Sequence, residues 1–436
     1  MKNLAEVHCW GQLVGALAYD PNTKISTFEY SSDWLNTGVE IAPIHMPLST
    51  QKYQFPHLNP ETYKGLPAVF ADTLPDDFGN AVINAWLARN GRDINSFSAL
   101  ERLLYTGKRG MGALEFAPAI SGNETKNEKL ELNSLVEMAQ QIINQRAKLT
   151  TDIDSKDSNN EAMSALFQVG TSAGGARAKA LIAINNDRTQ IRSGQTDAPQ
   201  GFEQYLLKFD GVEEHKSNSE VFGDPKGFGR MEYAYYLMAV DAGINISPSE
   251  LLVDGERAHF MTKRFDRINN SKYHMASLCA MDHADYKKAG TYSYEQLLGI
   301  ARQLRLSRQD AIEIYRRMVF NVIARNHDDH TKNTAFLLKD MQSQWQLAPA
   351  FDIAYSYKKD SPWVNAHQMS LSGKRDNFTR DDLLAVASLI GNFKKQAQQI
   401  IEQVLSVVSQ WQSYANKADV FEPLAEEIKQ NHRINF

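Results

Sequence analysis

The chain has 436 residues and a formal net charge of −5, from 47 Lys and Arg against 52 Asp and Glu, so roughly two or three domains with buried cores are expected. The mild acidity argues against a protein whose main role is to coat nucleic acid. Two distant cysteines, Cys9 and Cys279, exclude a disulfide framework and favour a cytoplasmic location. Glu6, His8 and Gln12 interrupt the first apolar residues, so no signal peptide and no membrane association are expected.

The first part of the chain predicts a small α+β domain, which we place at residues 1–150. Some of its stretches have the apolar pattern of strands and others have the apolar spacing of helices. The expected elements are strands within residues 7–19, 28–30 and 112–116 and helices within residues 74–102 and 133–149. The polar, acidic residues 150–160 that follow predict a surface loop or a domain boundary.

A glycine-rich stretch, residues 170–179, precedes an apolar run at residues 180–184 that predicts a strand. Small residues let backbone N–H groups approach an anion, and Arg177 or Lys179 could add positive charge. The stretch lacks the Gly-Lys-Ser/Thr ending of a Walker A loop. It is therefore either an anion-binding loop or a tight connection between elements.

Two further strands are expected in a second domain, residues 151–270. Residues 204–209 contain Lys208 in an apolar context, where an amine is costly unless it points outward or meets an anion. A helix that begins near Glu232 could supply a partner for Lys208, as a helix glutamate does in protein kinases. Residues 260–267 form the second predicted strand, which ends in charged residues.

The last part of the chain, residues 271–436, predicts a helix-rich domain. Helical spacing is found at residues 294–306, 309–326 and 381–412, and a hairpin is expected at residues 334–352. Strands first and helices later favour an α+β fold. We predict a bilobed, protein-kinase-like architecture with an N-terminal α+β subdomain and a helix-rich C-terminal lobe.

The stretch at residues 325–333, followed by residues 351–353, carries the strongest chemical signal. Asp328, Asn333 and Asp352 occur in the order and approximate spacing of the kinase catalytic aspartate and the two magnesium ligands. A solvated charged loop is the ordinary alternative.

A metal-dependent phosphohydrolase is another reading of the same stretch. His327, Asp328 and His330 could be metal ligands in such an enzyme. The other histidines offer no second His-Asp pair, which makes the hydrolase the weaker hypothesis.

Several motifs together resemble the HipA family, the serine/threonine kinase toxins of bacterial toxin–antitoxin modules. The similarity covers most of the chain. The matching stretches are residues 11–15, 28–30, 74–76 and 112–116 in the N-terminal part, and residues 172–179, 207–208, 263–267, 328–333 and 351–352 in the kinase core.

The resemblance implies a role for each matching residue. Asp328 would be the catalytic aspartate, Asn333 and Asp352 the Mg²⁺ ligands, and Ser172 a site of autophosphorylation that silences the kinase. The residues expected to contact ATP are Gly174, Gly175, Ala176, Arg177, Ala178, Lys179, Lys208, Lys263, Arg264, Phe265, His330, Thr331, Lys332, Asn333, Phe351 and Asp352. The family's Asp-Gly-His reads Asp-Asp-His here, so Asp329 adds a charge and replaces a glycine.

The same resemblance implies the biological setting. We expect a kinase that uses ATP and Mg²⁺, phosphorylates a protein such as an aminoacyl-tRNA synthetase, and is neutralised by a small helix-turn-helix (HipB-like) antitoxin with which it binds operator DNA. The alternative is a catalytically weak, kinase-like partner that serves as co-repressor of the antitoxin.

Overall fold

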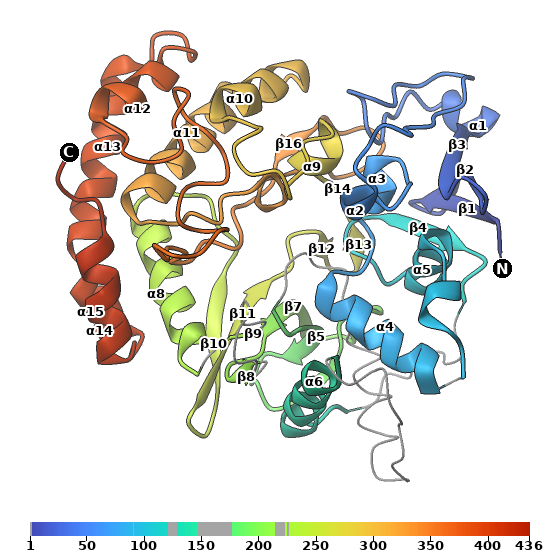
Figure 1. Cartoon of the computed structure of the whole chain (residues 1–436), viewed down its shortest axis with the longest axis horizontal. Helices are drawn as coiled ribbons and strands as arrows, with labels where there is room; N and C mark the ends of the chain where they lie inside the picture. Colours follow the sequence, from blue (N-terminus) through green and yellow to red (C-terminus); the bar gives the residue numbers. More distant parts are fainter. Residues whose placement is uncertain (1, 90, 121–128, 147–176, 214–222, 225) are drawn as a thin grey trace. The chain divides into compact units, whose positions relative to one another are not determined.

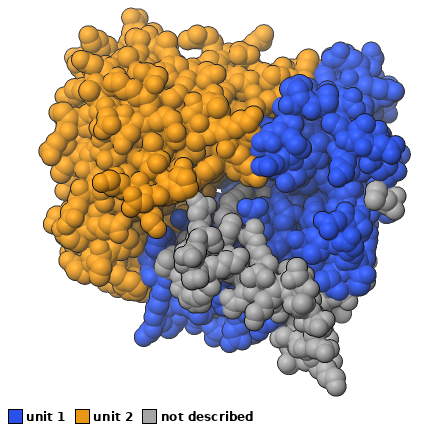
Figure 2. Space-filling model, in the orientation of Figure 1, with its two compact units in different colours: residues 1–39, 48–229, 250–274 blue, residues 40–47, 230–249, 275–436 orange. Residues whose placement is uncertain are grey.

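The computed structural model describes residues 2–89, 91–120, 129–146, 177–213, 223–224 and 226–436 (Figure 1). The described chain divides into two compact units, coloured separately in Figure 2. Unit 1 comprises residues 1–39, 48–229 and 250–274, and unit 2 comprises residues 40–47, 230–249 and 275–436. The division into three domains at residues 150 and 270 remains a prediction.

Unit 1 contains an N-terminal antiparallel sheet with the strand order β3-β2-β1-β4. Its strands are β1 (Leu4–Cys9), β2 (Gln12–Asp20), β3 (Ile25–Tyr30) and β4 (Leu114–Ala117). Side chains along β1 alternate between exposed and buried, as expected for a sheet with one face on a core. The accompanying helices are α1 (Ser32–Leu35), α2 (Pro60–Tyr63), α3 (Ala68–Ala71), α4 (Asp77–Arg89), a 3₁₀ turn (Ile94–Ser96) and α5 (Ala99–Thr106).

A second antiparallel sheet in unit 1 has the strand order β10-β11-β7-β5-β6. Its strands are β5 (Lys179–Asn185), β6 (Ile191–Ser193), β7 (Phe202–Lys208), β10 (Ser249–Asp254) and β11 (Arg257–Lys263). The strands predicted at residues 180–184, 204–209 and 260–267 correspond to β5, β7 and β11, except that β11 ends at Lys263, before the charged residues 264–267. Short strand pairs complete the unit: β8 (Val212–Glu213) with β9 (Gly223–Asp224), and β12 (Arg267–Ile268) with β13 (Ser271–Lys272).

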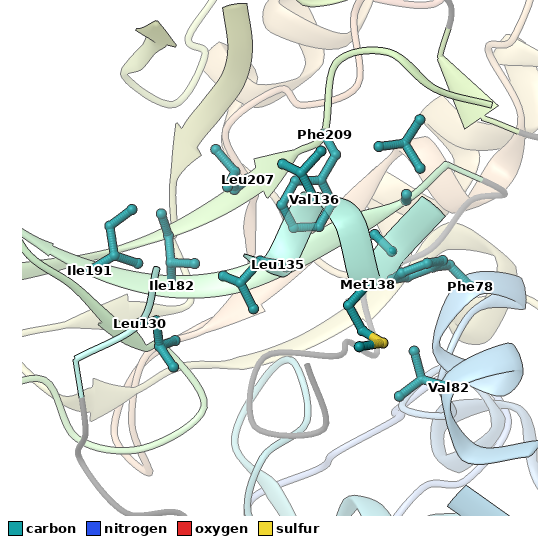
Figure 3. Close-up of a cluster of buried hydrophobic side chains, with 14 of the residues drawn as sticks. Phe78, Val82, Leu130, Leu135, Val136, Met138, Ile182, Ile191, Leu207 and Phe209 are labelled. Carbon is teal, nitrogen blue, oxygen red and sulfur yellow. The ribbon is translucent and has the colours of Figure 1, made fainter. Parts of the chain in front are cut away.

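The second sheet is covered by α6 (Leu132–Arg146), the amphipathic helix expected at residues 133–149. Leu135 and Val136 of this helix belong to one buried cluster with Leu207 and Phe209, which come from β7 and the residue after it (Figure 3). Phe78 of α4 joins the same cluster. Each large apolar side chain buried in this way contributes about 1.5–3 kcal/mol, so helix and sheet hold each other in place.

Buried charge also fixes the end of β11. Asp266 accepts hydrogen bonds from the Arg264 guanidinium at 2.7 and 2.9 Å and from Arg267 at 2.8 Å. The backbone N–H of Gly112 donates to the same carboxylate at 2.8 Å. Burial alone would raise the pKa of Asp266, but the two guanidinium groups hold that pKa well below its usual range. The charged end of the predicted strand is therefore an internal cluster that ties β11 to the residues before β4.

Unit 2 is mostly helical. Its helices are α8 (Phe228–Asp241, which begins at the boundary with unit 1), α9 (Leu278–Met281), α10 (Tyr294–Gln303), α11 (Arg308–Ile323), α12 (Arg380–Ala387), α13 (Lys394–Ser409), α14 (Trp411–Lys417) and α15 (Glu422–Asn431). Capping boxes begin α10 at Ser293 and α11 at Ser307. In each, the serine side chain accepts from the backbone N–H three residues later, and the side chain of that later residue accepts from the serine N–H. None of the described helices combines the length and apolar character that crossing a membrane would require.

A three-stranded sheet with the order β14-β15-β16 lies beside these helices. Its strands are β14 (His274–Ser277), β15 (Ala335–Leu338) and β16 (Gln346–Leu347). Phe336 pairs with Leu347 in antiparallel register, which confirms the hairpin expected at residues 334–352. The polar stretch between α11 and β15 is thereby held at both ends.

Candidate active site

The loop after α11 is tied to the segment that follows Asp352. The backbone N–H of His327 donates to the Ser356 carbonyl at 3.1 Å, and the N–H of Ser356 donates to the Arg325 carbonyl at 3.1 Å. These bonds form between two segments that lie apart in the sequence. They bring the Asp328 loop and the Asp352 segment together within unit 2.

Asn333 connects the predicted site residues. Its side-chain amide donates to the main-chain carbonyl of Asp328 at 2.8 Å, from the 3₁₀ turn Thr331–Asn333. Asn333 and Asp352 line one pocket of about 460 Å³, a volume that includes space open to solvent. His330 and Phe351 line it as well. Four residues expected from the sequence therefore meet at one pocket, and Asp328 is joined to them through Asn333.

Asp352 has a left-handed backbone conformation, with φ of 57°. Aspartate is one of the few residues other than glycine that adopt this region at modest cost. Such conformations cluster at functional sites, where surrounding structure holds them. The backbone at Asp352 is thus restricted to residues that tolerate a positive φ.

The carboxylate of Asp328 accepts a hydrogen bond from Trp363. The indole Nε1 lies 2.9 Å from Oδ1 of Asp328. The nearest ring nitrogen of His330 is 3.8 Å from the same oxygen, too far for a hydrogen bond. Nothing in the sequence pattern pointed to Trp363, because it lies in a loop without periodicity.

Asp329 is a buried structural carboxylate. It accepts hydrogen bonds from the Tyr294 hydroxyl at 2.7 Å, from Nδ1 of His367 at 2.8 Å and from the Gln368 N–H at 2.7 Å. Burial alone would raise its pKa, but His367 and the other two donors hold the pKa of Asp329 below its usual range. The extra charge noted in the sequence therefore anchors the loop internally.

His327 does not serve the metal-hydrolase hypothesis. Its Nδ1 lies 3.1 Å from the Val364 carbonyl and its Nε2 lies 3.3 Å from the Arg325 guanidinium, so both ring nitrogens are engaged. Burial, reinforced by the nearby His367, lowers the pKa of His327 to about 3. The ring is accordingly neutral, with Nδ1 as the donor.

Unit 2 is expected to lose stability in mild acid through His327 and His432. Burial lowers the pKa of His432 to about 3, and Nε2 of this ring lies 2.9 Å from the Tyr235 hydroxyl. Both pKa values lie below the unfolded value of about 6.5, so the unfolded chain takes up protons first as pH falls. Each ring should cost about 1.4 kcal/mol of unfolding free energy between about pH 7.5 and about pH 5.5.

Urea unfolding curves at the two pH values measure this loss. The His432→Gln variant removes one of the two titrating rings, so its pH difference should be smaller than that of the parent by about 1.4 kcal/mol. A variant with the same pH difference as the parent would refute the assignment.

The lysines of unit 1 that are predicted to contact ATP have partners within the protein. Lys179 forms a buried ion pair with Asp76, with Nζ 3.2 Å from the carboxylate. Burial raises the pKa of Asp76 to about 6, and Lys179 opposes the rise. Lys263 pairs with Glu203. Lys208 is buried in the central strand β7, where its Nζ lies 5.7 Å from the ring centre of Phe260. Their predicted contacts with ATP stay predictions.

The remaining predicted residues lie in several places. Arg264 belongs to the Asp266 cluster. Ala178 lies in the hydrophobic core of unit 1. Phe265 follows β11 and is half-buried. Arg177 lies 5.9 Å from the ring of Phe228. Thr331 donates to the Ala284 carbonyl at 2.5 Å, and Lys332 lies 5.2 Å from the Tyr286 ring. Ser172, Gly174, Gly175 and Ala176 fall outside the described residues.

Asn333 and Asp352 fit a magnesium ion by their chemistry. Carboxylate and amide oxygens suit Mg²⁺, which is usually held by one or two protein groups together with phosphates and water. In Asn333 the amide nitrogen already donates to the Asp328 carbonyl, so its oxygen is the atom suited to a cation. Within the described residues, no group of three or more His, Cys, Asp or Glu side chains is placed to hold a metal.

Two family models match the chain. The HipA N-terminal domain matches residues 5–117, and the HipA-like C-terminal domain matches residues 171–411, which is more than half of the chain. The chain belongs to the HipA family. As a HipA-family member it is a HipA-like serine/threonine kinase, an enzyme class that uses a nucleotide. No curated protein sequence matches it.

One solved HipA structure agrees with this assignment in fold. The HipA of Shewanella oneidensis MR-1, solved with HipB and its operator DNA, aligns with a TM-score of 0.57 at 15% identity, covering 98% of this chain and 100% of that chain. This match confirms the mixed α+β, kinase-like fold. The Helicobacter pylori proinflammatory kinase CtkA aligns with a TM-score of 0.30 at 14% identity, covering 52% of this chain and 92% of that chain.

Proposed function

We propose that this HipA-family chain transfers the γ-phosphoryl group of ATP to a serine or threonine of a protein, with Asp328 orienting the acceptor hydroxyl. The observation that carries the proposal is the assembly in unit 2, where Asn333 bonds to the main chain of Asp328 and shares a pocket with Asp352. Phosphoryl transfer needs this trio of an orienting carboxylate and two oxygen ligands for magnesium.

In the proposed reaction the acceptor oxygen forms a bond to the γ-phosphorus while the bond from that phosphorus to the bridging oxygen of ADP breaks. The hydroxyl proton passes to the carboxylate of Asp328 and then to solvent. Asn333 and Asp352 would hold Mg²⁺, which when bound neutralises charge on the phosphates. Lys208 is proposed to contact the phosphates, in line with the family motif.

We further propose the setting of a toxin–antitoxin module. The Shewanella relative is described as part of a toxin–antitoxin system and was solved with HipB and operator DNA, which supports a helix-turn-helix antitoxin and operator binding through that antitoxin. The proposed target is a protein such as an aminoacyl-tRNA synthetase. Autophosphorylation at Ser172 is proposed as the off-switch, because a phosphate there adds up to about two negative charges that repel nucleotide phosphates.

The direct test uses the purified full-length chain with γ-labelled ATP, with and without Mg²⁺. Label should enter protein only when Mg²⁺ is present, and peptide mass spectrometry should locate part of it at Ser172. Myelin basic protein serves as an added acceptor. Free phosphate without any phosphoprotein would favour a hydrolase. Undiminished complex formation with an antitoxin and operator DNA, without any transfer, would favour the co-repressor alternative.

A further inference from the structure

Three consecutive residues of the catalytic loop each hold the same short segment. We name residues 363–368 the clasp segment. His327 bonds to the Val364 carbonyl, Asp328 accepts from Trp363, and Asp329 accepts from His367 and Gln368. The clasp segment also closes on itself, since the Gln368 amide donates to the Trp363 carbonyl. Trp363 is therefore held by Asp328 of the catalytic loop and by Gln368 of its own segment.

The contact with Asp328 differs from the other two because its acceptor is the proposed catalytic carboxylate. Oδ1 of Asp328 receives the indole N–H at 2.9 Å. Oδ2 has no hydrogen-bond partner among the described residues. A donor on one carboxylate oxygen restricts rotation of the group. Oδ2 then has a fixed direction in which it can accept a hydrogen bond from the hydroxyl of the protein substrate.

Trp363 also differs from the tryptophans that stabilise the cores. Trp34 and Trp411 are each at most 2% exposed, and their indole N–H groups donate to main-chain carbonyls, of Val39 at 2.9 Å and of Ala425 at 2.8 Å. Trp363 is only half-buried and donates to a carboxylate that is itself partly exposed. A hydrogen bond at this position adds little core packing but fixes the direction of a reactive group.

We propose that Trp363 is a positioning residue of the kinase reaction: its indole N–H holds Oδ1 of Asp328 so that Oδ2 accepts the hydrogen bond of the protein hydroxyl. The inference rests on the proposed function of Asp328. It adds that the clasp segment, which follows the magnesium-binding Asp352 in the chain, sets the orientation of the catalytic carboxylate.

The test compares Trp363→Phe, which keeps an aromatic ring but removes the donor, with Trp363→His, which restores an N–H. Single-turnover transfer from γ-labelled ATP is measured with the chain itself and myelin basic protein as acceptors. Phe should lower the rate at saturating ATP by about 10- to 100-fold, because a small misplacement of a reacting group can cost about 100-fold. The ATP concentration for half-maximal rate should change less than about twofold, since ATP does not contact Trp363 in this proposal.

The His variant should recover part of the rate, a result that loss of packing alone does not predict. Trp345→Phe is the matched control, because Trp345 is also half-buried in unit 2, and it should keep the parent rate. A Phe variant with the parent rate, or a faster one, overturns the inference, as does a His variant no better than Phe. If Asp328→Asn remains active the proposed function itself fails, whereas an inactive Asp328→Asn beside a fully active Trp363→Phe refutes only the role of Trp363.

Discussion

The Asp328→Asn variant is expected to lose about 1,000-fold or more of the phosphate transfer to protein. Asparagine keeps the size of the side chain, and its amide oxygen can still accept the Trp363 indole N–H. It removes the negative charge and the ability to take up the hydroxyl proton, a contribution of about 10²–10⁴-fold in general base catalysis. The measurement is transfer of label from γ-labelled ATP to protein.

Asp340→Asn provides the matched control for this substitution. Asp340 lies in an exposed turn of unit 2, where it accepts from Ser343 at 2.7 Å and from the Gln342 N–H at 2.9 Å. The same change of charge there should leave the rate within about twofold of the parent, since surface substitutions have small effects. An Asp328→Asn protein with a rate near that of the parent would remove Asp328 from the catalytic role.

The second large effect is expected at Asp352. Its φ of 57° means that alanine would combine strain with loss of the carboxylate, so Asp352→Asn and Asp352→Gly are the informative variants. Asparagine and glycine both adopt a positive φ readily, and both substitutions remove the charge proposed to hold Mg²⁺. The transfer rate should fall by about 100- to 1,000-fold, within the range for losing electrostatic stabilisation of the transferred group.

The dependence of the rate on Mg²⁺ concentration identifies the cause. The Asn variant should need more Mg²⁺ for its residual activity, because an amide binds the cation more weakly than a carboxylate does. Asp419→Asn is the control, since Asp419 also has a positive φ, at 55°, but is exposed, and it should keep the parent rate and Mg²⁺ requirement. Full activity in Asp352→Asn would contradict the assignment of this ligand.

Much of the fold could be predicted because apolar spacing is a local property of the sequence. A continuous apolar run predicts the strand at residues 180–184, and helical periodicity predicts the helix at residues 309–326; the structure has β5 at the first and α11, which ends at Ile323, at the second. The stretch at residues 381–412 divides into α12, α13 and the start of α14, with Gly391 and Asn392, the latter at φ of 53°, between the first two helices. A local turn of this kind is weakly encoded in apolar spacing.

The candidate site could be predicted only where its residues form a motif. Asp328, Asn333 and Asp352 were found by order and spacing. Trp363 was missed, because its partner is 35 positions away in the sequence and neither residue's neighbours have a pattern that connects them. For the same reason, the ion pair of Lys179 with the distant Asp76 could not be foreseen.

The burial of Asp329 has a consequence for exchanging parts between relatives. Three donors, on Tyr294, His367 and Gln368, converge on its carboxylate. A chimera that received the Asp-Gly-His version of this loop would leave those donors buried without an acceptor, at about 1–3 kcal/mol for each. The loop and residues 363–368 therefore behave as one transplantable module, to be grafted as a set together with Tyr294.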